Sequence, residues 1–170
     1  MKLRIFHQCF ELLTGMIRKL GFTVVNEVGF GADLVARETR RLVTETDKRC
    51  IATSCPSVFG FVRKYNPGLM DSLAPVVSPM VASARALREV HGTDLRGVFI
   101  GPCIAKKGEA YGDDFEGEID EAMTFQELRS MFREGGISQE SSAESDFDLP
   151  YPGKGNLFPI RRGLLEAAGI

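Results

Sequence analysis

Two cysteine-containing segments, about fifty residues apart, hold the side chains of this sequence that are best suited to chemistry. The first reads TSCPS at residues 53–57, and the second reads FIGPCIAKKGE at residues 99–109. Each cysteine follows a short apolar run that we interpret as a buried strand, and the carboxyl ends of strands are where open α/β sheets build their sites. Two thiolates that converge there suit iron or zinc better than a hydrophobic core. The sequence therefore predicts a metal site that includes Cys55 and Cys103.

Cys55 lies between a predicted strand and a predicted helix. A thiolate there benefits from the partial positive charge of the helix amino terminus, which favours a metal ligand or a nucleophile. The alternative is a small buried residue at a tight turn, which is the commoner case for an isolated cysteine. The flanking serines and proline, together with the second segment, favour the ligand. A nucleophile ranks last because no histidine lies in a recognisable pairing context.

The second segment adds charge next to its cysteine. Cys103 follows Gly101 and Pro102, which bend the chain and allow its backbone to approach a ligand closely. Lysine pairs are usually solvated. However, Lys106 comes three residues after a candidate ligand, so it can point back and hydrogen-bond an anionic ligand of a metal. Glu109 is either a proton carrier or the next charge on a solvated face.

Other candidate residues carry weaker signals. We assign Cys9 and Cys50 to packing, because cysteine often behaves as a small hydrophobic residue. His7 and His91 have no neighbours that resemble a zinc site. The acidic run at residues 113–121 lacks the spacing of a divalent-ion site, so we interpret it as a solvated loop.

Composition limits the class of protein. The 170 residues predict one domain with a real core, and 44% hydrophobic and 26% charged residues are ordinary values. A net charge of -2 and scattered basic residues give no reason to expect a nucleic acid partner. No apolar stretch is long enough to span a bilayer, and the first residues lack the pattern of a signal peptide. Four cysteines are too few for a disulfide scaffold, so we expect a cytoplasmic, reducing setting.

Helical patterns alternate with short apolar runs, which predicts an α/β fold with a mainly parallel sheet flanked by helices. The predicted strands cover residues 22–28, 50–52, 97–100 and 119–122. The predicted helices cover residues 4–20, 32–45, 58–65, 79–91, 124–134 and 161–168. Residues 135–160 are rich in Gly, Ser, Asp, Glu and Pro, so we expect a long loop, either mobile or functional.

Together, these motifs resemble the catalytic domain in the large subunit of the iron-only hydrogenases, especially a branch fused to sensory or regulatory domains. The matching segments are residues 53–56 and 101–109, and the intervening residues 73–80 are also similar. The resemblance extends from residue 20 to residue 165. It implies that residues 1–170 are a single fragment of such a domain, with an iron-only hydrogenase-like partial fold.

The resemblance also implies roles for particular residues. Cys55 and Cys103 would ligate a 4Fe–4S cluster, which in this family can carry a two-iron subsite. Lys106 would hydrogen-bond a cyanide on that subsite, and Glu109 matches a carboxylate on the proton route. Ser54 occupies the position of a proton-relay cysteine. Molecular hydrogen and protons would be the substrates, and the redox partner would be ferredoxin or a fused regulatory domain.

Three departures from the family pattern modify this expectation. Ser54 replaces a cysteine, and a hydroxyl is a much weaker acid than a thiol, so proton delivery would slow. Gly101 replaces a bulky methionine that packs on the two-iron subsite. The family's last motif, with two more cysteines, and the strand that usually opens the domain are both missing. We therefore expect an excised piece that is inactive and free of cluster on its own.

Two functional hypotheses follow. In the first, the full-length parent oxidises, evolves or senses hydrogen, and Ser54 favours slow turnover and sensing. In the alternative, the domain holds only a 4Fe–4S cluster and acts in cluster assembly or redox regulation without hydrogenase activity. Lys106 favours the first hypothesis, whereas Gly101 favours the second.

Overall fold

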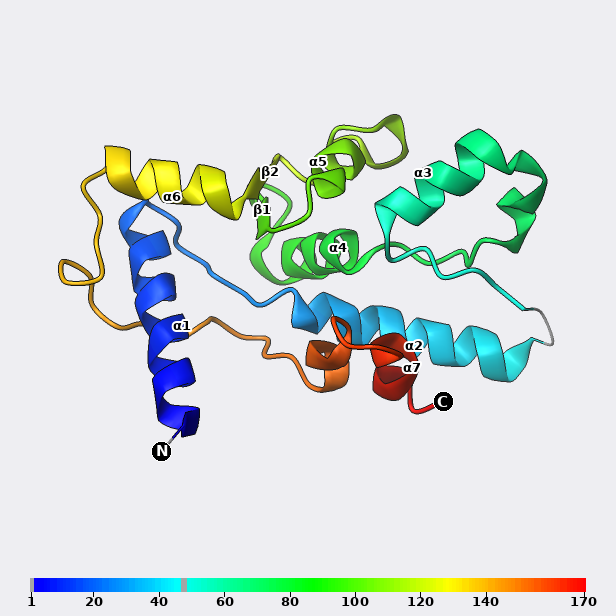
Figure 1. Cartoon of the computed structure of the whole chain (residues 1–170), viewed down its shortest axis with the longest axis horizontal. Helices are drawn as coiled ribbons and strands as arrows, with labels where there is room; N and C mark the ends of the chain where they lie inside the picture. The colour runs from blue at the N-terminus through cyan, green and yellow to red at the C-terminus, as the bar shows by residue number, and fades with distance from the viewer. Residues whose placement is uncertain (1, 47–48) are drawn as a thin grey trace.

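The structure is a computed structural model that describes residues 2–46 and 49–170 (Figure 1). The side chains of His7 and Cys9 lie outside the described part, so the packing predicted for Cys9 stays a prediction. The helices and strands are α1 (Lys2–Lys19), α2 (Gly29–Glu45), α3 (Pro56–Tyr65), α4 (Pro79–His91), β1 (Val98–Gly101), α5 (Ala105–Ala110), β2 (Glu121–Thr124), α6 (Phe125–Glu134) and α7 (Gly163–Ala168). Short 3-10 helices are η1 (Pro67–Ser72), η2 (Asp113–Phe115) and η3 (Lys154–Leu157).

The two strands form a small parallel sheet that separates two hydrophobic cores. Their register pairs Phe99 with Ala122 and Ile100 with Met123. Because successive side chains of a strand point to opposite faces, the two pairs face opposite sides. Phe99 and Ala122 contribute to one core, whereas Ile100 and Met123 contribute to the other.

Different helices complete each core. On the first face, α4 supplies Met80, Val81 and Ala84, all of them buried. On the second face, Ile17 of α1 meets the buried side chains of α6, Leu128 and Phe132. Figure 1 shows α1 and α6 together at one end of the molecule, with α4 beyond the sheet. The sheet thus fixes two helical layers relative to each other.

A further layer is built on α4 by α2, which in turn contacts α7 and η3. The approach of α2 to α4 requires a glycine, because a Cβ on Gly31 would lie 2.2 Å from the carbonyl oxygen of Pro79. Asp33 of α2 accepts backbone hydrogen bonds from Gly153 at 2.5 Å and from Gly155 at 2.7 Å. These contacts hold the carboxyl-terminal part of the chain against α2.

The predicted strand at residues 22–28 is wrong. This segment is extended but pairs with no strand of the described chain, because its hydrogen bonds go to the long loop instead. The Asp148 N–H donates to the Val25 carbonyl, and the Val25 N–H donates to the Asp148 carboxylate at 2.7 Å. Likewise, the strand predicted at residues 50–52 is reduced to a single parallel bridge between Ile51 and Leu73.

The α/β class is confirmed, but the sheet is smaller than predicted and helices dominate. The helix expected after the Gly29–Gly31 turn begins at Gly29 itself. Thr124 caps α6 as predicted, in a capping box with Glu127. Residues 135–160 are irregular apart from η3. Within the described ranges, no helix combines the length and apolar character needed to cross a membrane.

Candidate functional site

The first cysteine segment is held along residues 73–76. Ile51 bridges Leu73, and the Thr53 hydroxyl lies 3.1 Å from the carbonyl oxygen of Ala74 and 2.5 Å from that of Val76. The chain then enters α3, with Cys55 as the extended N-cap residue and proline in the first helical position. Proline suits that position because no N–H is needed there. The Cys55 side chain is exposed.

The second cysteine segment leaves β1 at the buried residue Gly101. Cys103 follows two residues later and is also exposed. Its carbonyl oxygen accepts the backbone N–H of Lys106 at 3.1 Å, which starts the turn into α5. The hydrophobic pattern does not predict α5, because a helix of six residues is too short to show a period.

An ion pair within α5 connects the two segments. The Lys106 ammonium lies 2.6 Å from the Glu109 carboxylate, and their side chains are only 11% and 6% exposed. The same ammonium lies 3.5 Å from the carbonyl oxygen of Ser54, the residue before Cys55. Lys106 therefore does point back to the first cysteine segment. A solvated face for Glu109 is contradicted by its burial.

Surface contacts also join the helices that follow the two segments. Helix α3 contacts α5, and Arg63 of α3 forms an ion pair of 2.7 Å with Asp114 of η2. Lys107, by contrast, turns away and pairs with Glu127 of α6 at 2.6 Å. The structure thus brings all five predicted site residues into one region. They are Ser54, Cys55, Cys103, Lys106 and Glu109.

The Phe99 ring fills the space next to Gly101. A Cβ built on Gly101 would lie 2.8 Å from ring atoms Cε1 and Cζ of Phe99. The smaller residue therefore accommodates the aromatic ring of its second neighbour on the same strand. Strand periodicity places residues 99 and 101 on the same face, but it does not say that the ring of one folds over the other.

A cubane cluster needs more donor atoms than this region supplies. A 4Fe–4S cluster takes four thiolates, and the region described above supplies two, from Cys55 and Cys103. Over residues 2–46 and 49–170, no three His, Cys, Asp or Glu side chains group as a metal site. The described residues therefore do not complete a cubane site by themselves.

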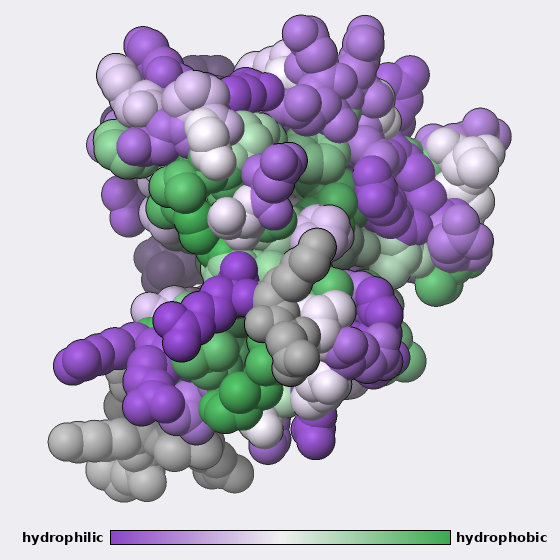
Figure 2. Space-filling view, turned by 90° about the vertical axis from the view of Figure 1, so that its right-hand side faces the viewer, coloured by the Kyte–Doolittle hydropathy of each residue, from purple (hydrophilic) through white to green (hydrophobic). Residues whose placement is uncertain are grey.

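Cys50 is exposed, so its assignment to packing is wrong. It lines a groove of about 120 Å³ that lies beside the first cysteine segment. The groove is mainly apolar, with Leu42 and Val43 from α2, and Leu164 and Leu165 from α7. Figure 2 shows the side of the molecule where α2 ends, with hydrophobic residues open to solvent among hydrophilic ones.

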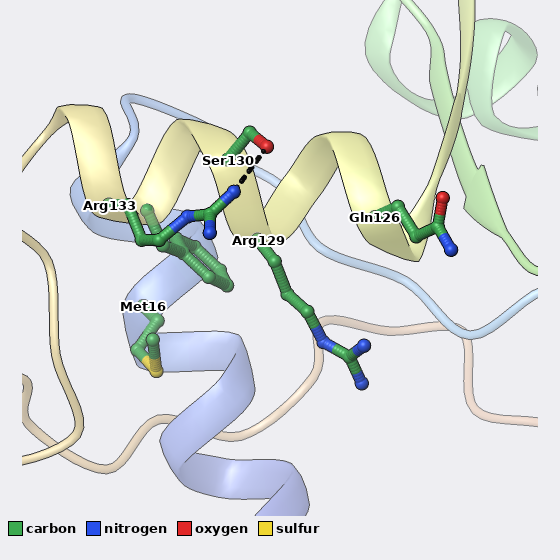
Figure 3. A pocket seen from close by; sticks show the side chains of 6 residues that line it. Met16, Gln126, Arg129, Ser130 and Arg133 are labelled. Atoms are coloured by element: carbon green, nitrogen blue, oxygen red, sulfur yellow. Dashed lines mark hydrogen bonds between the residues drawn. The ribbon is translucent and has the colours of Figure 1, made fainter.

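A second, wider groove of about 590 Å³ lies over α1 and α6. Figure 3 shows Arg133 folded back onto Ser130, with a hydrogen bond of 2.9 Å, whereas Arg129 extends away from α6. None of the five predicted site residues lines this groove. It is separate from the cysteine region and gives no support to the predicted chemistry.

Two residues that position the site were not identified from the sequence. Thr53 fixes the first segment through its hydroxyl, and Phe99 shapes the second. The pairing of Lys106 with Glu109 was also missed. Their spacing is that of neighbours one helical turn apart, so a prediction of α5 would have suggested it.

Comparisons of the whole chain with known proteins agree on one family. Residues 1–170 match the family described as iron only hydrogenase large subunit, C-terminal domain. Iron hydrogenase 1 of Clostridium pasteurianum is 29% identical over 89% of this chain and 30% of its own length. The cytosolic Fe-S cluster assembly factor NAR1 of Yarrowia lipolytica is 26% identical over 91% of this chain and 35% of its own length. The chain thus spans about a third of the curated relatives it matches.

A solved structure agrees with the sequence match. An apo variant of the FeFe-hydrogenase HydA1 from Chlamydomonas reinhardtii superposes with a TM-score of 0.70 at 27% identity. The superposition covers 84% of this chain and 41% of that one.

Proposed function

The chain belongs to the family of C-terminal domains of iron-only hydrogenase large subunits, and from this premise we propose that Cys55 and Cys103 are two thiolate ligands of an iron–sulfur cluster. The observation that carries the proposal is the buried Lys106–Glu109 pair, whose ammonium reaches the carbonyl of Ser54. It links the segments of the two exposed thiols, although these lie 48 positions apart in the sequence. The remaining thiolates of the cluster come from outside the described residues.

In the whole protein we propose that this site works on hydrogen. The relatives named as hydrogenases support molecular hydrogen and protons as substrates. We propose ferredoxin or a fused regulatory domain as the redox partner from the family resemblance alone. Lys106 hydrogen-bonds an anionic ligand of the metal, as its direction toward the first cysteine segment supports. Ser54 and Glu109 lie beside it and are the candidate proton-handling groups.

Ser54 is the candidate proton relay, and the speed of its proton transfer decides between fast hydrogen turnover and hydrogen sensing. A serine hydroxyl gives up its proton far less readily than a thiol, so we expect slow hydrogen turnover. Ser54→Cys should raise the rate of hydrogen oxidation or evolution, measured with a Clark-type hydrogen electrode on anaerobically matured protein. An unchanged rate in a variant with full iron content would remove Ser54 from the proton route.

A second candidate function is supported by the similarity to NAR1, whose name states a role in Fe–S cluster assembly. In this case, the domain holds a 4Fe–4S cluster without a two-iron subsite. Gly101, whose neighbouring space is filled by Phe99, favours this candidate. Infrared spectra of matured protein separate the two functions, because only a two-iron subsite gives carbonyl and cyanide bands.

The first test of the shared proposal is iron and acid-labile sulfide content after anaerobic reconstitution of the whole polypeptide in which this chain occurs. We expect about four irons per protein. Cys55→Ser and Cys103→Ser should each lower the iron content, whereas Cys50→Ser, the exposed matched control, should not. If neither variant loses iron, the two thiols are not ligands and the proposal fails.

A further inference from the structure

We propose that Glu109 is a positioning residue, which holds Lys106 against the first cysteine segment and so preforms the two-thiol site before any metal enters. This inference rests on the proposed function, and it gives Glu109 a role in addition to proton transfer. The contact that carries it is the chain of three groups formed by the Glu109 carboxylate, the Lys106 ammonium and the Ser54 carbonyl oxygen.

Burial makes this chain of groups different from the other ion pairs near the site. The side chains of Lys106 and Glu109 are 11% and 6% exposed. Arg63 and Asp114, which join the helices that follow the two segments, are 58% and 47% exposed. A desolvated charge must keep its partner, because an unpaired charge in a low-dielectric site is strongly unfavourable. The Lys106 ammonium is therefore confined, whereas an exposed arginine can exchange its partner for water.

The positions of these groups show that Glu109 controls the direction of the Lys106 side chain. Lys106 lies three residues after Cys103, and its ammonium reaches the residue before Cys55. Four methylene groups give a lysine side chain many rotamers, and a carboxylate one helical turn away selects those that point across to Ser54. Without Glu109, the ammonium would turn toward solvent, and the polar connection between the two thiol-bearing segments would be lost.

The test measures the two thiols directly in metal-free protein, so it does not depend on whether a cluster binds. Cys9→Ser and Cys50→Ser first remove the other two thiols of these 170 residues. A short bismaleimide then bridges Cys55 and Cys103, and the rate of ring closure after the first addition reports their mutual orientation. We expect Glu109→Gln to slow ring closure about tenfold, because loss of orientation lowers the effective molarity of the second thiol.

Matched variants separate positioning from general damage. Asp114→Asn breaks the exposed ion pair between α3 and η2, the helices that follow the two segments, and should change ring closure by less than about twofold. Glu109→Asp keeps the charge and should recover part of the rate. A third variant, Lys106→Met with Glu109→Gln, removes both charges and so leaves no unpaired buried ion if Glu109→Gln alone fails to fold.

The outcomes are decisive in either direction. Slow ring closure in Glu109→Gln and in the double variant, with a native circular dichroism spectrum, supports the proposal. Ring closure at the original rate in the folded double variant overturns it, because the polar connection would then not position the thiols. Iron content, measured in parallel on the reconstituted protein, tells this failure apart from failure of the proposed cluster site.

Discussion

At the scale of single residues, the end of β1 is shaped by the fit between Gly101 and the Phe99 ring. Any side chain on residue 101 must displace the ring, because a Cβ there would lie 2.8 Å from its atoms. Gly101 is buried, and the ring packs against the core that contains Met80 and Val81. The two residues therefore act as one packing unit beside the second cysteine segment.

We predict that Gly101→Met lowers the free energy of unfolding by about 1–3 kcal/mol, the usual cost of overpacking. Urea unfolding followed by circular dichroism measures this change. Phe99→Ala combined with Gly101→Met should be more stable than the sum of the two single changes predicts, since the new side chain takes the place of the ring. Gly108→Ala is the control, because a Cβ at Gly108 meets no atom within 4 Å.

Glu127 shows how a surface carboxylate can be tuned by its contacts. The Lys107 ammonium first, and then the backbone N–H and hydroxyl of Thr124, lower the pKa of Glu127 to about 2 from 4.5. A lowered folded-state pKa means that the contribution of Glu127 to stability is present above pH 4.5 and is lost as the pH falls toward about 2.

We therefore predict that the Glu127 carboxyl carbon titrates by NMR with a midpoint near its lowered pKa, about 2. Lys107→Gln removes the largest cause and should move the midpoint of Glu127 up toward 4.5. A midpoint near 4.5 in the unaltered protein would show that the ion pair with Lys107 does not persist in solution.

At the scale of elements, a single arginine fixes the long loop to α1. The Arg18 guanidinium donates to the Thr23 carbonyl at 2.7 Å, to the Ser145 hydroxyl at 2.9 Å and to the Asp148 carboxylate at 2.7 Å. Asp148 in turn accepts the backbone N–H of Val25. Residues 135–160 therefore contain a segment that is tied down at several points, despite a composition typical of mobile loops.

We predict that Arg18→Ala makes residues 140–150 the first site of limited proteolysis and lowers stability by about 1–2 kcal/mol, since several acceptors lose their donor. Arg41→Ala is the control, because Arg41 pairs on the exposed surface of α2 with Glu38 and Glu45. Its removal should leave both the urea midpoint and the cleavage pattern essentially unchanged. Equal cleavage in the two variants would contradict the role of Arg18.

The amphipathic helices with clear ends were the elements best predicted from the sequence. Thr124 marks the start of α6 through a capping box, because caps act locally. Ser78 is the N-cap residue of α4, but its side chain makes no cap hydrogen bond, so Pro79 in the first helical turn is the better marker of that start. The extended segment at residues 22–28 was assigned to a sheet because β-branched residues favour extension, but its hydrogen-bond partner is Asp148, about 120 residues away. Local pattern determines extension, whereas distant side chains decide what the extended chain pairs with.

In the candidate site, too, local sequence predicted some features, whereas others depend on distant packing. The positions of Cys55 and Cys103 next to predicted strand ends suggested that the two thiols converge. The burial of Lys106 and Glu109 could not be predicted, because it depends on the packing of α5 against α3. The exposure of Cys50 likewise depends on how α2 and α7 flank it.

At the scale of the whole molecule, the two cores lie on opposite faces of a sheet of only two strands. Val81 is a buried member of the core that contains α4, and Leu128 is a buried member of the core between α1 and α6. Among the described residues, the two cores have no member in common, so changes at the two positions should act independently.

We predict that Val81→Ala costs about 2 kcal/mol and Leu128→Ala about 2–5 kcal/mol of unfolding free energy. The double variant should show the sum to within about 0.5 kcal/mol in urea unfolding. A coupling clearly larger than this would mean that the sheet transmits packing changes from one core to the other.

The contacts of Arg18 also affect the order in which tertiary contacts can form while the chain is being synthesised. The arginine leaves the ribosome well before its partners Ser145 and Asp148, which follow 127 and 130 residues later. At about 5–20 residues per second, that interval lasts several seconds or longer. During this time, the apolar side of α1 must wait for α6 and the loop that follows it. The apolar side of α1 therefore stays without its native cover until translation has passed Asp148.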